Sequence, residues 1–139
     1  MKIYTGKCGC GDLEYSFEGE PINSVFCYCR DCQIGTGSDK WFGLWVPTSQ
    51  FKFIKGSPKV YTRLGDSGKE LHINFCSRCS TNICTEVTVG GFYSVAVSTL
   101  TGDHSFVPKM SIYAASAAQW AEFPEGVPKF DVLPPGMGG

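Results

Sequence analysis

The chain has 139 residues, of which 42% are hydrophobic, and this fits one domain with a substantial core. Its net charge is −1 and it contains no run of basic residues. Phosphate backbones recruit clusters of Lys and Arg, so we expect no nucleic-acid partner. The sequence contains no long apolar stretch, so we expect neither a signal peptide nor a membrane span. We therefore expect a cytoplasmic protein whose cysteines are kept reduced.

Most of the periodic segments alternate apolar and polar residues, as half-buried strands do. In chain order, strands are expected at residues 13–18, 23–26, 41–46, 51–54, 59–62, 70–75, 83–89 and 92–97. Gly56-Ser57-Pro58 predicts a turn, and Gly90-Gly91 predicts a hairpin. The pattern predicts a mainly β fold in a single domain over residues 1–133, followed by a tail over residues 134–139.

Helix is expected in only three short places. Residues 30–34 fit a single turn, and residues 49–53 allow a short helix in place of a strand. The alanine-rich residues 114–121 give the best helical segment, of about two turns.

The eight cysteines have two interpretations. An even number allows a set of disulfides, with roughly 105 possible pairings. Against this, the chain shows no export signal, and C-x-C is too tight for an easy disulfide. The cysteines also fall into short clusters, and soft thiolate ligands at such spacing favour zinc. Metal is therefore the preferred interpretation.

Two cysteine pairs predict a structural zinc site. Cys8 and Cys10 are two residues apart and would share one face of a strand. Cys76 and Cys79 have the C-x-x-C spacing of structural zinc sites. Together the four thiolates complete a tetrahedron. Such an ion would tie the N-terminal segment to the middle of the chain and remove much chain entropy.

The remaining cluster, Cys27, Cys29 and Cys32, predicts a catalytic zinc site. Three protein ligands leave an open position. An external thiol is a natural fourth ligand, and zinc would hold it as the nucleophilic thiolate. We expect this ion to bind more weakly than the structural one, so the site can be empty in purified protein. The alternative is that Cys84 closes the site, although a buried core thiol is our first interpretation of Cys84.

The loop Gly35-Thr36-Gly37-Ser38 directly follows the three-cysteine cluster. Glycines let the backbone approach a ligand, and hydroxyls donate hydrogen bonds. Thr36, Gly37 and Ser38 are therefore candidate substrate contacts, and an ordinary turn is the alternative.

The histidines and the tryptophan-rich strand have plainer interpretations. His72 and His104 lack ligand spacing to any cysteine cluster, so we expect surface or packing roles. Trp41, Phe42 and Trp45 are expected mainly in the core, although one of them could wall a pocket.

The order of the motifs resembles the glutathione-dependent formaldehyde-activating family over about residues 3–130. The motifs that carry the resemblance are Gly6-Lys7-Cys8-Gly9-Cys10-Gly11, Cys27-Tyr28-Cys29-Arg30-Asp31-Cys32, Thr36-Gly37-Ser38 and Phe75-Cys76-Ser77-Arg78-Cys79. The family usually has Gly where this chain has Ser80.

The resemblance implies a zinc-bound β-tent fold with two zinc ions. It implies a structural site at Cys8, Cys10, Cys76 and Cys79 and a catalytic site at Cys27, Cys29 and Cys32. The implied activity is that of an S-(hydroxymethyl)glutathione synthase. Such an enzyme adds a thiol, glutathione or a similar one, to a small aldehyde such as formaldehyde, or cleaves the carbon–sulfur bond in reverse.

Three functions are therefore considered. The first is a zinc-dependent carbon–sulfur lyase or synthase that acts on a small-molecule thiol and an aldehyde. The second is a non-catalytic zinc module that binds a protein or carries metal, and the third is a thiol redox enzyme that uses Cys84. The open three-cysteine site favours the first. The sequence specifies no oligomeric state.

Overall fold

The computed structural model describes residues 1–136, and the last residues of the expected tail, 137–139, lie outside it. The strands are β1 (Ile3–Lys7), β2 (Glu14–Glu18), β3 (Asn23–Cys27), β4 (Trp41–Pro47), β5 (Phe51–Lys55), β6 (Lys59–Leu64), β7 (Glu70–Phe75), β8 (Asn82–Val87), β9 (Phe92–Ala96), β10 (Leu100–Thr101) and β11 (Met110–Ile112). The helices of this part of the chain are α1 (Arg30–Thr36) and three single 3-10 turns, η1 (Thr48–Gln50), η2 (Val97–Thr99) and η3 (Ala114–Ser116). The predicted mainly β fold is thus confirmed. Within residues 1–136, no helix has the length and apolar character needed to span a membrane.

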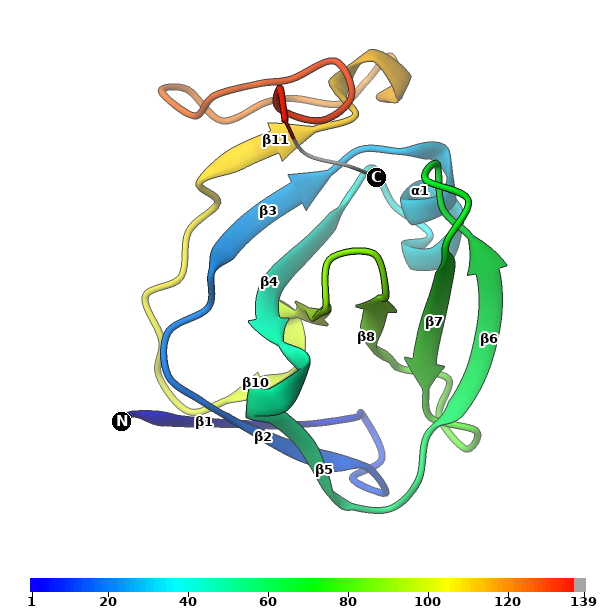
Figure 1. Cartoon of the computed structure of the whole chain (residues 1–139), viewed down its shortest axis with the longest axis vertical. Helices are drawn as coiled ribbons and strands as arrows, with labels where there is room; N and C mark the ends of the chain where they lie inside the picture. The colour runs from blue at the N-terminus through cyan, green and yellow to red at the C-terminus, as the bar shows by residue number, and fades with distance from the viewer. Residues whose placement is uncertain (137–139) are drawn as a thin grey trace.

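The strands form two sheets (Figure 1). The smaller sheet has the order β10-β1-β2-β5, and the larger has the order β11-β3-β4-β9-β8-β7-β6. Neighbouring strands are antiparallel except β11, which runs parallel to β3. Figure 1 shows the larger sheet curving, so that β3 and β4 face β6 and β7 across its hollow side, with α1 at the upper end.

The main core lies between the two sheets. Tyr15 and Phe17 of β2 are fully buried there, together with Leu44 and Val46 of β4. The Tyr15 hydroxyl pairs with the Thr99 hydroxyl at 2.8 Å, so its buried polar group is satisfied. Alternate residues of the larger sheet thus meet the smaller sheet, because side chains alternate along a strand.

Along the strands of the larger sheet, the residues that alternate with the core-facing ones face the hollow side of that sheet. The strand register places five of these in one row across the sheet, in the order Trp45, Ser94, Thr85, Ile73 and Tyr61. This row runs along the floor of the site described below.

Two helical expectations differ from the structure. Only η1 forms near residues 49–53, because Phe51 begins β5, which pairs with β2 and buries the Phe51 ring. The two turns expected at residues 114–121 reduce to η3. The backbone leaves the helical conformation at Ala117, whose ψ is 147°, and the amides of Ala114 and Ala115 donate to the carbonyls of Phe130 and Asp131.

Candidate active site and metal centres

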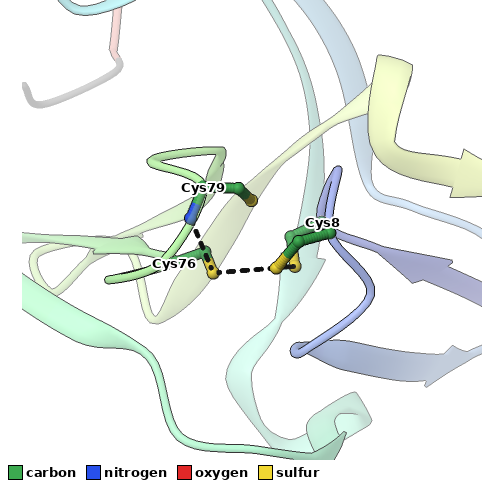
Figure 2. A group of neighbouring side chains, drawn as sticks. Cys8, Cys76 and Cys79 are labelled. Carbon is green, nitrogen blue, oxygen red and sulfur yellow. Dashed lines mark hydrogen bonds between the residues drawn. The ribbon is translucent and has the colours of Figure 1, made fainter.

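The first cysteine cluster contains Cys8, Cys10, Cys76 and Cys79, whose sulfur atoms all lie within 4.8 Å of one another. Figure 2 shows Cys8 approaching from the N-terminal segment, and Cys76 and Cys79 approaching from the turn that follows β7. Cys10 lies 3.7 Å from both Cys8 and Cys76, sulfur to sulfur. The expectation that Cys8 and Cys10 share a strand face was wrong. Both follow the end of β1, in a turn.

Backbone amides surround the sulfur atoms of this cluster. The Leu13 amide donates to Cys8 at 3.2 Å, and the Arg78 and Cys79 amides donate to Cys76 at 3.4 Å. The Thr81 hydroxyl lies 3.1 Å from the Cys79 sulfur, and this hydrogen bond, together with backbone hydrogen bonds from Thr81 and Cys10, lowers the pKa of the Cys79 thiol to about 5. Donors aimed at sulfur favour thiolates, the form that binds metal.

Ser80 stands in a position that suits glycine. Its φ is 65°, in the left-handed region, and its amide donates to the Cys76 carbonyl at 2.8 Å. This bond closes the turn that presents Cys76 and Cys79. The departure from the family's Gly therefore keeps the turn, with the conformational cost that a side chain carries there.

The sulfur spacing fits tetrahedral zinc. A Zn–S bond of about 2.3 Å places neighbouring sulfur atoms about 3.8 Å apart. The 3.7 Å separations around Cys10 agree with this value. The first cluster is therefore a suitable metal centre.

The second cluster brings together Cys27, Cys29 and Cys32, also within 4.8 Å of one another. Cys27 ends β3, Cys29 is the N-cap of α1, and Cys32 lies in the first turn of that helix. The Cys32 amide donates to the Cys29 sulfur at 3.3 Å. Hydrogen bonds from Cys27 and Cys32 lower the pKa of Cys29 to about 3, and Cys29 in turn raises the pKa of Cys27 to about 12. These three soft ligands suit zinc as well.

The second cluster lies in the wall of a cavity of about 540 Å³ on the hollow side of the larger sheet. We call this space the sheet cavity. Near the cysteines, Arg63 of β6 contacts Asp31 of α1 at 3.4 Å. Tyr113, after β11, donates from its hydroxyl to Asp66 in the β6–β7 turn at 2.6 Å. Both pairs join segments far apart in sequence at the cysteine end of the cavity.

Tryptophan side chains from β4 also line the sheet cavity. The Trp41 indole N–H donates to the Ser94 hydroxyl at 2.9 Å. A Cβ at Gly43 would lie 2.1 Å from that hydroxyl and 2.5 Å from the indole nitrogen, so only glycine lets Trp41 lie here. Trp45 stacks on Phe92, with the ring centroids 4.5 Å apart. The tryptophans expected mainly in the core thus face the cavity.

The loop after the second cluster has mostly internal partners. The Thr36 hydroxyl donates to the Cys32 carbonyl at 2.8 Å, and Gly37 is the left-handed C-cap of α1. Ser38 bonds Asp39 at 3.2 Å. Of the three candidate substrate contacts, Thr36 lines the cavity, as does the preceding Gly35.

Cys84 and the two histidines lie away from both clusters. Cys84 is fully buried in the main core, and burial raises the pKa of its thiol. Such a thiol is inert and fills space. His72 contacts Glu86 at 3.0 Å on the opposite face of β7 from the cavity. The exposed His104 ring stacks near Phe106.

Sequence reasoning missed Arg63, Asp66, Ser94 and Tyr113 as cavity residues. Side chains alternate along residues 59–64 and 92–96, so Arg63 shares a face of its strand with Tyr61, and Ser94 shares a face of its strand with Phe92. This alternation could have identified both residues from the sequence. Tyr113 had no local signal, because the β11–β3 pairing brings it to the site.

Comparisons with known proteins agree with the motifs. The model of the family described as "Glutathione-dependent formaldehyde-activating enzyme" matches residues 3–116. The chain is also similar to the crystal structure of a Rhodobacter sphaeroides protein, with a TM-score of 0.58 and 19% identity. That similarity covers 75% of this chain and 97% of the other, and it supports the fold. A comparison with curated proteins finds no match.

Proposed function

Because the chain belongs to the glutathione-dependent formaldehyde-activating enzyme family, we propose that it is a zinc-dependent carbon–sulfur lyase or synthase. It would join a thiol, glutathione or a similar one, to a small aldehyde such as formaldehyde, or cleave the adduct. The observation that carries this proposal is the convergence of Cys27, Cys29 and Cys32 in the wall of a cavity. Three thiols beside an open space leave room for a fourth sulfur from a substrate.

The two clusters would divide the roles of the metal. Cys8, Cys10, Cys76 and Cys79 would hold a structural zinc, since four ligands close a site. Cys27, Cys29 and Cys32 would hold the catalytic zinc. Bound there, zinc would accept an external thiol and keep it as a thiolate near neutral pH.

The chain's own residues would position the reactants. In the forward direction a bond forms between the thiolate sulfur and the aldehyde carbon, and the aldehyde oxygen takes up a proton. The carbon–oxygen double bond becomes a single bond, and the product is a hemithioacetal. The proton would come from a water molecule or from the hydroxyl of Tyr113, a residue that lines the cavity and whose hydroxyl is hydrogen-bonded to Asp66. Thr36 borders the same space and would contact the substrate there, with Gly37 and Ser38 supporting it.

The proposed setting follows from the thiols. Both clusters need reduced cysteines, which a reducing compartment such as the cytoplasm maintains. The partners would be small molecules, since a net charge of −1 gives no attraction to nucleic acid.

The test is a thiol–aldehyde exchange assay with zinc supplied and several thiols, including glutathione. Cys29→Ser should abolish acceleration while leaving the thermal melting curve within a few degrees, because the four-cysteine centre is intact. Cys84→Ala is the matched control, since it removes a cysteine that lies outside both clusters. We expect it to retain activity. If no thiol is accelerated, or Cys29→Ser is as active as the wild type, the enzyme proposal fails. Zinc binding without acceleration would then favour a non-catalytic module.

A further inference from the structure

The sheet cavity is much larger than formaldehyde. Its volume is about 540 Å³, within the range of about 300–1,000 Å³ typical of sites for drug-sized ligands. A molecule of the size of formaldehyde would fill on the order of a tenth of it, taking about 30 Å³ for each water-sized unit. Most of the cavity must therefore accommodate another part of the reacting molecules.

Apolar side chains line most of the sheet cavity. Phe92, Val87 and Leu71 follow one another across β9, β8 and β7 in register. Ile73 lies in the neighbouring row, beside Thr85. Trp45 stacks on Phe92 and extends the apolar surface onto β4. These rings and branched chains favour an apolar ligand by burial of its surface.

Charged side chains are few and gather at the cysteine end. Of the described cavity-lining residues, Arg63 is the one cation, and Asp31 lies 3.4 Å from it. Asp66 is the other carboxylate of the lining, and it accepts a hydrogen bond from Tyr113. Glutathione carries two carboxylates and an ammonium group at neutral pH. A wall with one cation, already beside a carboxylate, cannot pair with all of these groups.

We propose that the adduct handled at Cys27, Cys29 and Cys32 carries an aryl or branched-alkyl body, and that this body lies in the sheet cavity. The inference rests on the proposed thiol–aldehyde chemistry and assigns its substrate class. The body belongs to either the thiol or the aldehyde, since the new carbon–sulfur bond joins them at the same place. Ser94, Thr85 and the Trp41 indole add a few polar groups along the floor, as in sites that orient a mainly apolar ligand.

The test compares three substrate pairs on the zinc-supplied protein, with exchange rates followed by NMR. The reference pair is glutathione with formaldehyde. One arm uses phenylmethanethiol with formaldehyde, and the other uses glutathione with benzaldehyde. We expect kcat/KM for at least one aryl pair to exceed the reference by tenfold or more, and the arm that gains identifies the partner that carries the body.

A charge placed in the cavity provides the second readout. Ile73→Lys puts an ammonium group on the apolar floor, and Val60→Lys makes a similar change on the exposed face of the neighbouring strand β6. Ile73→Lys should lower the preference for the aryl pair at least tenfold, and Val60→Lys should leave that preference within twofold. Melting curves check that both variants fold.

The outcomes separate the two proposals. If the reference pair is accelerated and neither aryl pair exceeds it, the substrate class is wrong and the proposed function stands. If no pair is accelerated, both fail. The wild-type comparison decides the substrate class even where Ile73→Lys does not fold. Equal preference in folded Ile73→Lys and wild-type protein would place the aryl group outside the cavity and overturn the inference.

Discussion

Replacing Cys76 by alanine tests whether the four-cysteine cluster is a metal cross-link. Cys84→Ala is the matched control, because both thiols are buried, with 2% and 0% of their surface exposed. Each substitution removes one sulfur atom from a packed region, at a similar packing cost. Cys84 belongs to neither cluster. Any additional loss in Cys76→Ala therefore measures the cross-link.

The size of that loss follows from the loop that the cluster closes. Cys10 and Cys76, whose sulfur atoms are 3.7 Å apart, are separated by 66 positions in sequence. Treated as a covalent cross-link, a loop of this length contributes about 4 kcal/mol by restricting the unfolded chain. In a domain of this size that loss lowers the melting temperature by about 15 °C.

The assay is denaturant unfolding of the wild type, Cys76→Ala and Cys84→Ala, each with zinc and with a chelator. With zinc, Cys76→Ala should be about 4 kcal/mol less stable than Cys84→Ala. In chelator the wild type should lose its cross-link, so that difference should largely disappear. The cross-link would be refuted if Cys76→Ala and Cys84→Ala lowered the free energy of unfolding equally in zinc. It would also be refuted if the additional loss in Cys76→Ala were as large in chelator as in zinc.

Three further predictions concern the core, the cavity and the pH dependence. Tyr15→Phe should cost about 1 kcal/mol in urea unfolding, because it removes a buried hydrogen bond; an unchanged midpoint would contradict this. Gly43→Ala should displace the Trp41 indole, so its fluorescence spectrum should shift and activity should fall; an unchanged spectrum would show that the cavity absorbs the methyl group. Glu86 raises the pKa of His72, so their pair stabilises the fold fully below about pH 6.5 and loses this effect as the pH rises through the raised pKa. The stability difference between the wild type and Glu86→Gln should therefore shrink above neutral pH, and a growing difference would refute the assignment.

The sequence was sufficient for the grouping of cysteines and for most strands. Thiol spacing is local information, and the alternation of residues such as Leu71 and Ile73 marks a strand face directly. The reason given for Cys8 and Cys10 was nevertheless wrong, because a turn rather than a strand brings their sulfur atoms together. The predicted grouping of the cysteines was unaffected, since the turn also brings both sulfur atoms within 4.8 Å of those of Cys76 and Cys79.

The helix expected at residues 114–121 could not be judged locally. Alanine favours helix by intrinsic propensity. Here the backbone groups of Ala114 and Ala115 pair with the distant residues Phe130 and Asp131. Tyr113, just before this segment, has a φ of 56° and turns its ring toward Asp66. Long-range pairing thus fixes the start of this segment, and the β11–β3 pairing delivers Tyr113 to the cavity.

A β-bulge in β8 changes which of its side chains face the cavity. Along β8 the register shifts by one residue, since Asn74 pairs with Cys84 but Phe75 pairs with Asn82. Ile83 is the extra residue, and it is buried in the core together with Cys84. Asn82 and Thr85 consequently both line the cavity, although simple alternation would separate them. A slip of one residue exchanges the two faces of a strand. The bulge at Ile83 therefore lets Asn82 join Thr85 on the cavity side, while Ile83 and Cys84 both stay in the core.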